Sequence, residues 1–527
     1  MTLSNIRTTV FLLAMTFLPT SALMAQVGAS QPGTGFTILH TNDLHGHITS
    51  WQGWEGELAG KTVGGMDRLA SVVQQIRGAI GASNVLLLDA GDTLGDTMIA
   101  DETKGKTIIE VMNTIGYNAM VIGNHEPDFT ARVLKQRVAE AKFPVLAANI
   151  IETRTGKFFT QPFIIKDVNG IRVGILGIAY PNTPFTTAKM NVQDLEFRDA
   201  VATVRSFIPK LKTAGAQIVI VLSHYGLSSD IKLAQQVPGI DIIVGGHSHN
   251  RMKNALREHN TLIVQAGAHG SDVGRLDLEV VKGKIVGHQH RLITLDNAVI
   301  PRDPQVGSLI DRALATHATK LNEYLAETRT PLSRAQTIAG ETPRKRDQES
   351  LADSLFADII REKTQADVVI LPGLGYGVAI GAGKITANDL RNLIPHDSKT
   401  VTMTLTGDQI KEILEQSLEN TYTDDPKQKV GGIVQVSGIT FKYNAAGSYP
   451  QRLIAVRVNG APLVMDRTYK IATNSLLAQG GHHYKSFLMG KNIEEKETQY
   501  LLVKKALQQR GTIQAPVPGR IVKTEGL

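Results

Sequence analysis

Short runs of Val, Ile and Leu alternate with longer segments of helical spacing between about residues 35 and 295. Within each run the apolar residues follow one another without a polar residue at every second position. Strands that are buried on both faces show this pattern, whereas half-exposed strands alternate. The pattern therefore predicts an α/β domain over residues 35–300. The expected strands are residues 36–40, 85–89, 119–123, 171–178, 218–223 and 240–245.

The chain after residue 300 has a different pattern. Apolar side chains recur at helical spacing between two prolines, and we expect residues 301–339 to form a linker helix. Residues 340–527 hold apolar runs of their own and are numerous enough for a second, smaller α/β domain with a separate core. A long helix between two cores is a candidate hinge. The strands expected in the second domain are residues 366–371, 400–405, 452–458 and 469–473, with a helix around residues 408–418.

The first residues have the pattern of a secretory signal. Arg7 supplies a positive charge, residues 10–18 are apolar, and Ala22 and Ala25 supply small side chains for a cleavage site. We expect residues 1–25 to be removed on export, which makes the protein secreted or periplasmic. A membrane anchor is the alternative, but the apolar stretch is short for a spanning helix. No later apolar run is long enough to cross a bilayer.

Composition narrows the chemistry. Of the 527 residues, 42% are apolar and 20% are charged, as in ordinary globular proteins of two domains. Cysteine is absent, which excludes disulfides, thiolate metal ligands and a cysteine nucleophile. The formal charge of +7 is not gathered in a basic tract. It gives little support for a nucleic acid polymer as partner and suits a small acidic substrate.

Polar clusters follow five of the predicted strands. In open α/β sheets, ligands bind beyond the carboxyl ends of the strands, so we expect these clusters to converge on one surface. Glycines within them allow the backbone to turn sharply and to approach a bound ion or phosphate. The clusters are residues 41–47 (TNDLHGH), 89–92 (DAGD), 123–128 (GNHEPD), 223–226 (SHYG) and 245–249 (GGHSH).

Taken singly, each cluster has an ordinary alternative. A histidine at a strand end is often a hydrogen-bonded structural residue, and Asp or Asn in a glycine-rich turn often caps the next helix. Five such clusters in one fold favour metal binding instead. Carboxylate, imidazole and amide donors without sulfur suit Zn, Mn, Fe or Mg, and their number implies more than one ion. A pair of metal ions can clamp a phosphoryl group and activate water, which predicts a hydrolase.

The motifs HTNDLHGH, LDAGD, GNHEPD, SHYG and GGHSH resemble those of the secreted 5′-nucleotidase family of calcineurin-like metallophosphoesterases. The resemblance covers nearly the whole mature chain, strongly in the first domain and more loosely in the second. It implies a four-layer α/β/β/α first domain, a smaller α/β C-terminal substrate domain and two divalent metal ions bridged by Asp89. The implied ligands are Asp43, His45, Asp89 and His249 for one ion, and Asp89, Asn124, His224 and His247 for the other. Many relatives carry Asn or Gln at the position of His249.

The resemblance also implies a catalytic dyad beside the metals, matched here by His125 and Asp128. His125 would stabilise charge on the phosphoryl oxygens or protonate the leaving group, and Asp128 would orient it, with helix capping as the alternative for Asp128. Pro127 replaces the aromatic residue that is usual between them. The expected reaction is an in-line attack by metal-activated water without a covalent intermediate. Three other motif residues have no assigned ligand role and are candidates for supporting the ligands: Glu126, Asp92 and His47.

The nucleotide clamp that this family carries in its second domain departs from the family pattern. Pro372 stands where an asparagine belongs, and Gly377 stands where an arginine belongs. His396 replaces one phenylalanine that stacks on the nucleobase. Tyr484 keeps the second ring of the clamp, with packing inside the domain as an equal alternative. The sequence therefore defines the reaction better than the substrate.

We expect a phosphomonoesterase of the 5′-nucleotidase type that acts on nucleotides or a related small phosphate. The second interpretation is a 2′,3′-cyclic phosphodiesterase or a thiosulfohydrolase-like enzyme on the same metal centre, because residues 372–377 and 431–439 also resemble the sulfur-oxidation thiosulfohydrolases. The third is a binding protein without turnover, and the intact dyad argues against it.

Overall fold

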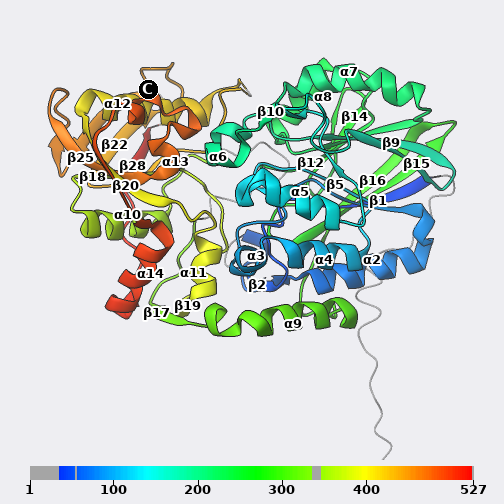
Figure 1. Cartoon of the computed structure of the whole chain (residues 1–527), viewed down its shortest axis with the longest axis horizontal. Helices are drawn as coiled ribbons and strands as arrows, with labels where there is room; N and C mark the ends of the chain where they lie inside the picture. The colour runs from blue at the N-terminus through cyan, green and yellow to red at the C-terminus, as the bar shows by residue number, and fades with distance from the viewer. Residues whose placement is uncertain (1–34, 54–55, 335–345, 426, 525–527) are drawn as a thin grey trace, which may run out of the picture.

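Two domains lie side by side in the computed structural model, the first on the right and the second on the left of Figure 1. The structure describes residues 35–53, 56–334, 346–425 and 427–524. The predicted signal sequence, residues 1–25, lies outside these ranges. Within them, no helix is both long and apolar enough to span a membrane.

Two six-stranded sheets form the centre of the first domain. Neighbouring strands that carry the predicted clusters are parallel, so their carboxyl ends lie at the same edge. In order across the first sheet the strands are β16 (Lys284–Thr294), β15 (Asp272–Val281), β1 (Gly35–Thr41), β4 (Val85–Asp89), β5 (Ala119–Val121) and β6 (Val145–Leu146). In the second they are β13 (Leu256–Glu258), β14 (Thr261–Val264), β12 (Ile242–Gly245), β11 (Ile218–Ser223), β9 (Ile171–Ile178) and β8 (Phe163–Val168).

Side chains from successive residues of each strand enter two different cores. Leu86 and Leu88 of β4 pack between the sheets, whereas Val85 and Leu87 face the helices of the first sheet. This double burial explains the continuous apolar runs of the sequence. The layers are helices, sheet, sheet, helices, which confirms the predicted four-layer fold. The first sheet is covered by α2 (Met66–Ile80), α3 (Met98–Thr103), α4 (Lys106–Ile115), α5 (Ala131–Glu140) and α9 (Pro304–Leu321), and the second by α7 (Ala200–Thr213) and α8 (Leu227–Gln236).

The second domain is built around a five-stranded sheet with one core on each face. The strands are β21 (Gln435–Ser437), β18 (Val368–Leu371), β25 (Thr468–Asn474), β20 (Lys399–Thr406) and β26 (Lys491–Thr498). Helices α10 (Leu351–Thr364) and α14 (Gln499–Arg510) cover one face. The other face packs on α12 (Gly407–Tyr422) and on a four-stranded sheet of β24 (Ala461–Pro462), β23 (Leu453–Val458), β22 (Ile439–Asn444) and β28 (Ile521–Thr524).

The predicted linker helix is shorter than residues 301–339. Helix α9 begins after Asp303, whose side chain accepts a hydrogen bond from the backbone N–H of Val306, and it ends at Leu321. Its apolar face belongs to the core of the first domain. The chain then forms β17 (Tyr324–Thr328), which pairs with β19 (Gly383–Thr386) and β27 (Thr512–Ile513) of the second domain. Because those partners are distant in sequence, local periodicity did not reveal the strand.

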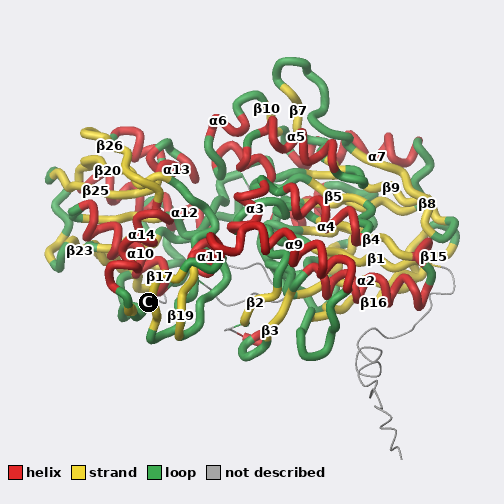
Figure 2. Tube along the Cα trace, turned by 60° about the horizontal axis from the view of Figure 1, so that its bottom comes forward, coloured by secondary structure: helices red, strands yellow, loops and turns green. Residues whose placement is uncertain are grey.

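The two domains meet beside this junction. Helix α11 (Ala387–Leu393) of the second domain lies next to α9 and α3 of the first (Figure 2). Arg391 of α11 forms ion-paired hydrogen bonds of 2.6 and 3.0 Å with both carboxylate oxygens of Asp101. On another part of the boundary, the hydroxyl of Tyr180 donates to the backbone oxygen of Lys429. The second domain is thus docked against the loops at the carboxyl ends of the strands.

Candidate metal centre

The loops that follow β1, β4, β5, β11 and β12 converge at one edge of the two sheets, as the sequence predicted. Their side chains form two groups in which the potential ligand atoms all lie within 4.8 Å of one another. The first group is Asp43, His45 and His249, and the second is Asp92, His224 and His247. Five of these six residues are buried, and His247 is partly buried.

In the first group, the nitrogens and oxygens point at a common space. Nε2 of His45 lies 3.1 Å from Nε2 of His249, and Oδ1 of Asp43 lies 3.2 Å from the same His249 nitrogen. The other nitrogen of His45, Nδ1, is 2.5 Å from Oδ2 of Asp96. A carboxylate on Nδ1 fixes the ring and leaves Nε2 available, which is the usual support of a metal-binding histidine.

The second group adjoins the first. Nε2 of His224 lies 2.9 Å from Oδ2 of Asp92 and 3.9 Å from Oδ1 of Asp43. Nδ1 of His224 is 2.6 Å from the backbone oxygen of Ala90, which again directs Nε2 toward the centre. The side-chain oxygen of Asn124 is buried and has no hydrogen-bond partner among the described residues. An orphaned buried oxygen of this kind fits a ligand that a metal ion would satisfy.

Backbone strain is concentrated at these residues. Five of the ligand candidates, Asp43, His45, Asp92, His247 and His249, have φ between 47° and 70°, in the left-handed region. Residues with a Cβ atom adopt this region at a cost of about 1–3 kcal/mol each, and such residues gather at functional sites. Five of the six residues in the two groups therefore have this backbone conformation, His224 being the exception.

The structure does not place Asp89, the predicted bridge, in either group. Its Oδ2 accepts a hydrogen bond of 2.7 Å from Thr41, and its Oδ1 accepts bonds from Thr93 Oγ1 and from the N–H of Gly91. Asp89 is the last residue of β4 and lies beside Thr41 in the β1–β4 register, so its side chain joins the two strands. Burial raises the pKa of Asp89 to about 7. Asp92, three residues later, belongs to the second group, with its Oδ2 2.9 Å from Nε2 of His224.

Two of the predicted supporting residues differ in their surroundings. The Glu126 carboxylate accepts hydrogen bonds from the backbone N–H groups of Asp92, Thr93, Leu94 and Gly123, and so fixes the β4 and β5 loops to each other. His47 lies further from the centre, with Nδ1 3.1 Å from the backbone oxygen of Leu44.

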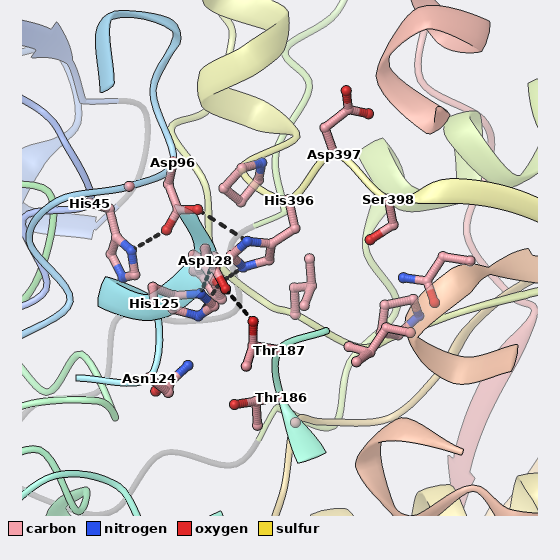
Figure 3. A pocket seen from close by; sticks show the side chains of 18 of the residues that line it. His45, Asp96, Asn124, His125, Asp128, Thr186, Thr187, His396, Asp397 and Ser398 are labelled. Carbon is pink, nitrogen blue, oxygen red and sulfur yellow. Dashed lines mark hydrogen bonds and ion pairs between the residues drawn. The ribbon is translucent and has the colours of Figure 1, made fainter. Parts of the chain in front are cut away.

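His125 and Asp128, the predicted dyad, are in contact. Nδ1 of His125 is 2.7 Å from Oδ2 of Asp128, and Oδ1 of Asp128 accepts a hydrogen bond from Thr187 Oγ1 (Figure 3). Nε2 of His125 faces the centre, 4.0 Å from Oδ2 of Asp92. Burial lowers the pKa of His125, but the carboxylates of Asp92, Asp128 and Asp96 outweigh it and raise that pKa well above its ordinary value.

A cavity of about 400 Å³ opens over the metal centre and is lined by both domains. His396 of the second domain lines it, as predicted, but its ring stacks on His125 at 4.3 Å between centroids. Its Nδ1 is 3.1 Å from Oδ1 of Asp96 (Figure 3). Tyr376 and Arg346 also reach the cavity from the second domain, with the guanidinium of Arg346 5.4 Å from the Tyr376 ring centroid.

Tyr484 does not line the cavity. It is 1% exposed and packs in the core between the five-stranded sheet and α12, with its ring centroid 6.1 Å from that of Phe487. Of the two roles considered for Tyr484, the structure thus shows packing. His482 of the same segment lines the cavity instead. Pro372 lines it too, so the altered clamp loop does reach the site.

Three residues of the site were missed in the sequence. Asp96 follows Asp92 in the same glycine-containing loop, and a second acid beside the DAGD motif was a usable signal. Tyr376 stands next to Gly377 in the loop that lacks the family's asparagine and arginine, and its hydroxyl was a usable signal. Arg346 lies outside every motif, and nothing local marks it.

Comparisons with known proteins identify the two domains. Residues 36–251 match the calcineurin-like phosphoesterase model, and residues 328–488 match the model of the 5′-nucleotidase C-terminal domain. The chain is 28% identical over 540 residues to the snake venom 5′-nucleotidase of Naja atra, covering 93% of this chain and 99% of that protein. It is 29% identical over 518 residues to the human 5′-nucleotidase, covering 88% and 87%.

A solved structure of similar fold is the 5′-nucleotidase precursor from Thermus thermophilus, with a TM-score of 0.84, 24% identity and coverage of 93% of this chain and 100% of that one. The family matches extend over both domains, and the relatives match over nearly the whole chain. The chain therefore belongs to the calcineurin-like phosphoesterases that carry a 5′-nucleotidase C-terminal domain, a family of metal-dependent phosphoester hydrolases.

Proposed function

We propose that this protein is an exported phosphomonoesterase of the 5′-nucleotidase type, which releases phosphate from nucleotides or related small phosphate esters at a centre of two divalent metal ions. The observation that carries the proposal is the pair of adjoining donor groups, the second of which includes Asp92, with the His125–Asp128 dyad at their side. Membership of the phosphoesterase family supports the reaction, and the N-terminal signal pattern supports export.

The residues present fit two metal ions. In the proposed assignment, one ion is held by Asp43, His45 and His249, and the other by Asn124, His224 and His247, with Asp92 shared. Asp92 supports this role because its Oδ1 accepts the N–H of His125 at 2.8 Å while its Oδ2 faces His224. The donor set has no sulfur, which suits Zn, Mn or Fe. When bound, the ions polarise the phosphoryl oxygens and lower the pKa of a water molecule.

The side chains around the ions orient and stabilise the substrate. His125 points Nε2 at the centre, where it is placed to contact a phosphoryl or ester oxygen, and Asp128 holds its ring through Nδ1. Arg346 brings a partly buried positive charge to the cavity, and desolvation lowers the pKa of its guanidinium below its ordinary value. A guanidinium pairs well with the oxygens of a phosphate, so we assign it to substrate binding.

The names of relatives support a nucleotide as substrate. The altered clamp residues of the second domain, however, do not restrict the leaving group to a nucleoside. The Naja atra and human relatives are called 5′-nucleotidases. Pro372, Gly377 and His396, however, replace the family's clamp residues in this chain. The phosphate part of the substrate is therefore better supported than the group to which it is attached.

The test is metal analysis followed by a substrate panel. The purified mature protein should contain two divalent ions, lose activity on chelation and regain it with Mn²⁺ or Zn²⁺. The panel comprises 5′-nucleotides, a 2′,3′-cyclic nucleotide, sugar phosphates and a thiosulfonate. Preference for the cyclic nucleotide or the thiosulfonate would replace the proposed reaction with the second interpretation. Two bound ions without hydrolysis of any member would refute turnover.

A further inference from the structure

Tyr376 reaches from the second domain into the metal centre of the first. Its ring stacks on His45, with centroids 5.1 Å apart and planes 22° apart, and it meets His249 edge-on at 5.0 Å. Its hydroxyl oxygen lies 3.3 Å from Nε2 of His125. That nitrogen is the one that faces the centre. The hydroxyl therefore lies where the catalytic dyad meets the cavity.

Two residues hold the Tyr376 hydroxyl in place. It is hydrogen-bonded to Nε2 of His396, and Nδ1 of His396 lies 3.1 Å from Oδ1 of Asp96. Asp96 in turn contacts Nδ1 of His45 through its other oxygen. The row Tyr376–His396–Asp96 thus joins the second domain to a ligand candidate of the first. Phe at position 396, as the family pattern has it, would offer no such bond.

We propose that Tyr376 is a catalytic residue supplied by the second domain, whose hydroxyl donates a hydrogen bond to the ester oxygen that leaves phosphorus. His396 is a positioning residue for it. This inference rests on the proposed function. We place the leaving group toward the second domain, because residues of that domain line the cavity together with those of the metal centre. An ester oxygen between His125 and Tyr376 would be in contact with both.

The hydroxyl hydrogen of Tyr376 can be donated to one partner in the free protein and to another in the substrate complex. The O–H group turns about the C–O bond, so its hydrogen can face His396 in the free protein and the ester oxygen in the complex. Tyr376 gives a hydrogen bond and keeps its proton. Water adds its oxygen to phosphorus, the ester P–O bond breaks, and one proton of the water ends on the leaving alcohol while the other remains with the phosphate.

Two esters of different leaving groups separate this role from a structural one. The leaving group of a 5′-nucleotide is the nucleoside alkoxide, which develops much negative charge on the ester oxygen. The leaving group of nitrophenyl phosphate is nitrophenolate, whose charge is stabilised by the ring. Tyr376→Phe should lower kcat/KM for the nucleotide about 10- to 100-fold, because a hydrogen bond to developing charge is lost, and should lower it much less for the nitrophenyl ester. His396→Ala should show the same pattern, and His396→Gln, which can still accept the hydroxyl, should restore most of the loss.

A second tyrosine of the same domain provides the control. Tyr500→Phe removes another buried hydroxyl of the second domain, bonded to the backbone oxygen of Ala387, and should change neither ester. Metal content is measured for each variant. Equal losses on the two esters, no loss, or loss of a metal ion from Tyr376→Phe would overturn the inference alone. A wild-type protein that binds two ions and hydrolyses neither ester refutes the proposed function and, with it, this inference.

Discussion

Asp89 and Asp92 provide the sharpest test of the metal centre, because they are three residues apart in one loop and the structure gives them different roles. In Asp92→Asn, the retained Oδ1 still accepts the N–H of His125, while an amide group replaces the oxygen that faces His224 at 2.9 Å. The substitution is nearly isosteric. It removes an anionic donor from the position that we propose the two metal ions share.

The expected loss at position 92 follows from its contacts. Loss of a residue that merely supports a ligand costs about 10- to 100-fold in metal affinity, so loss of a shared ligand should cost at least about 100-fold. The metal content should fall below two ions per chain, and kcat/KM should fall by at least the same factor. The assays are elemental analysis of the dialysed protein, calorimetric titration with Mn²⁺ and hydrolysis of a phosphate monoester.

Asp89→Asn is the matched control. Asp89 accepts three hydrogen bonds, and an amide in place of one oxygen disrupts at least one of them. We expect a loss of about 1–3 kcal/mol in the free energy of unfolding, with both metal ions retained once the protein is folded. For a domain of this size each kcal/mol corresponds to about 2–4 °C in Tm. If Asp89→Asn loses metal while Asp92→Asn keeps both ions, the assignment of the bridge to Asp92 is refuted.

The remaining predictions concern other residues of the first domain and the cavity. His125→Ala should lower kcat by about 10²- to 10⁴-fold with two ions still bound, and Asp128→Asn should lower it less; loss of metal from either variant would contradict the dyad. Arg346→Met should raise KM for a phosphate monoester about 10- to 100-fold with little change in metal content, and an unchanged KM would remove Arg346 from the substrate site. Burial raises the pKa of Asp230 to about 7, and the hydrogen bond that its carboxylate accepts from Ser223 only partly offsets this. Because the folded protein then holds this proton more tightly than the unfolded chain, the free energy of unfolding should fall as pH rises from about 4 to about 7, by at most about 4 kcal/mol. Asp230→Asn should lack that part of the slope in denaturant titrations at a series of pH values, and an identical slope in both proteins would contradict the shift.

The layers of the fold and the location of the site could be predicted because both depend on local pattern. Strands buried on two faces give continuous apolar runs, and β4, β9 and β11 lie at the predicted residues. Their loops had to meet, since parallel neighbours end at a common edge.

The choice between Asp89 and Asp92 could not be made in this way. Asp89 ends β4, and its side chain is directed at Thr41 of the neighbouring strand. Gly91, at a φ of 86°, then turns the chain and brings Asp92 into the centre. Which of two acids in a four-residue motif enters a site depends on that turn, and sequence spacing alone does not contain it.

Contributions from the second domain were the least predictable. Tyr376 and Arg346 reach the site only because the two domains dock, more than 200 residues after the first ligand. Tyr484 has an aromatic side chain in a clamp motif, but its ring packs in the core beside α12 and does not line the cavity. The aromatic residue type correctly predicted that Tyr484 is buried, but it did not predict whether the ring lies in the domain core or in the cavity.

The junction between the domains sets the geometry of any opening motion. Helix α9 ends at Leu321 in the first domain, and Glu323 is already bound to the second, where its backbone oxygen accepts the N–H of Ala387 and its carboxylate contacts Gln508. Asn322 is therefore the single covalent pivot. A rigid body that rotates moves each atom in proportion to its distance from the rotation axis, so α11, which packs beside α9, would shift little in a rotation about this residue. A substrate that enters between the domains would then pass on the side away from α9, and Tyr376 would move with the second domain.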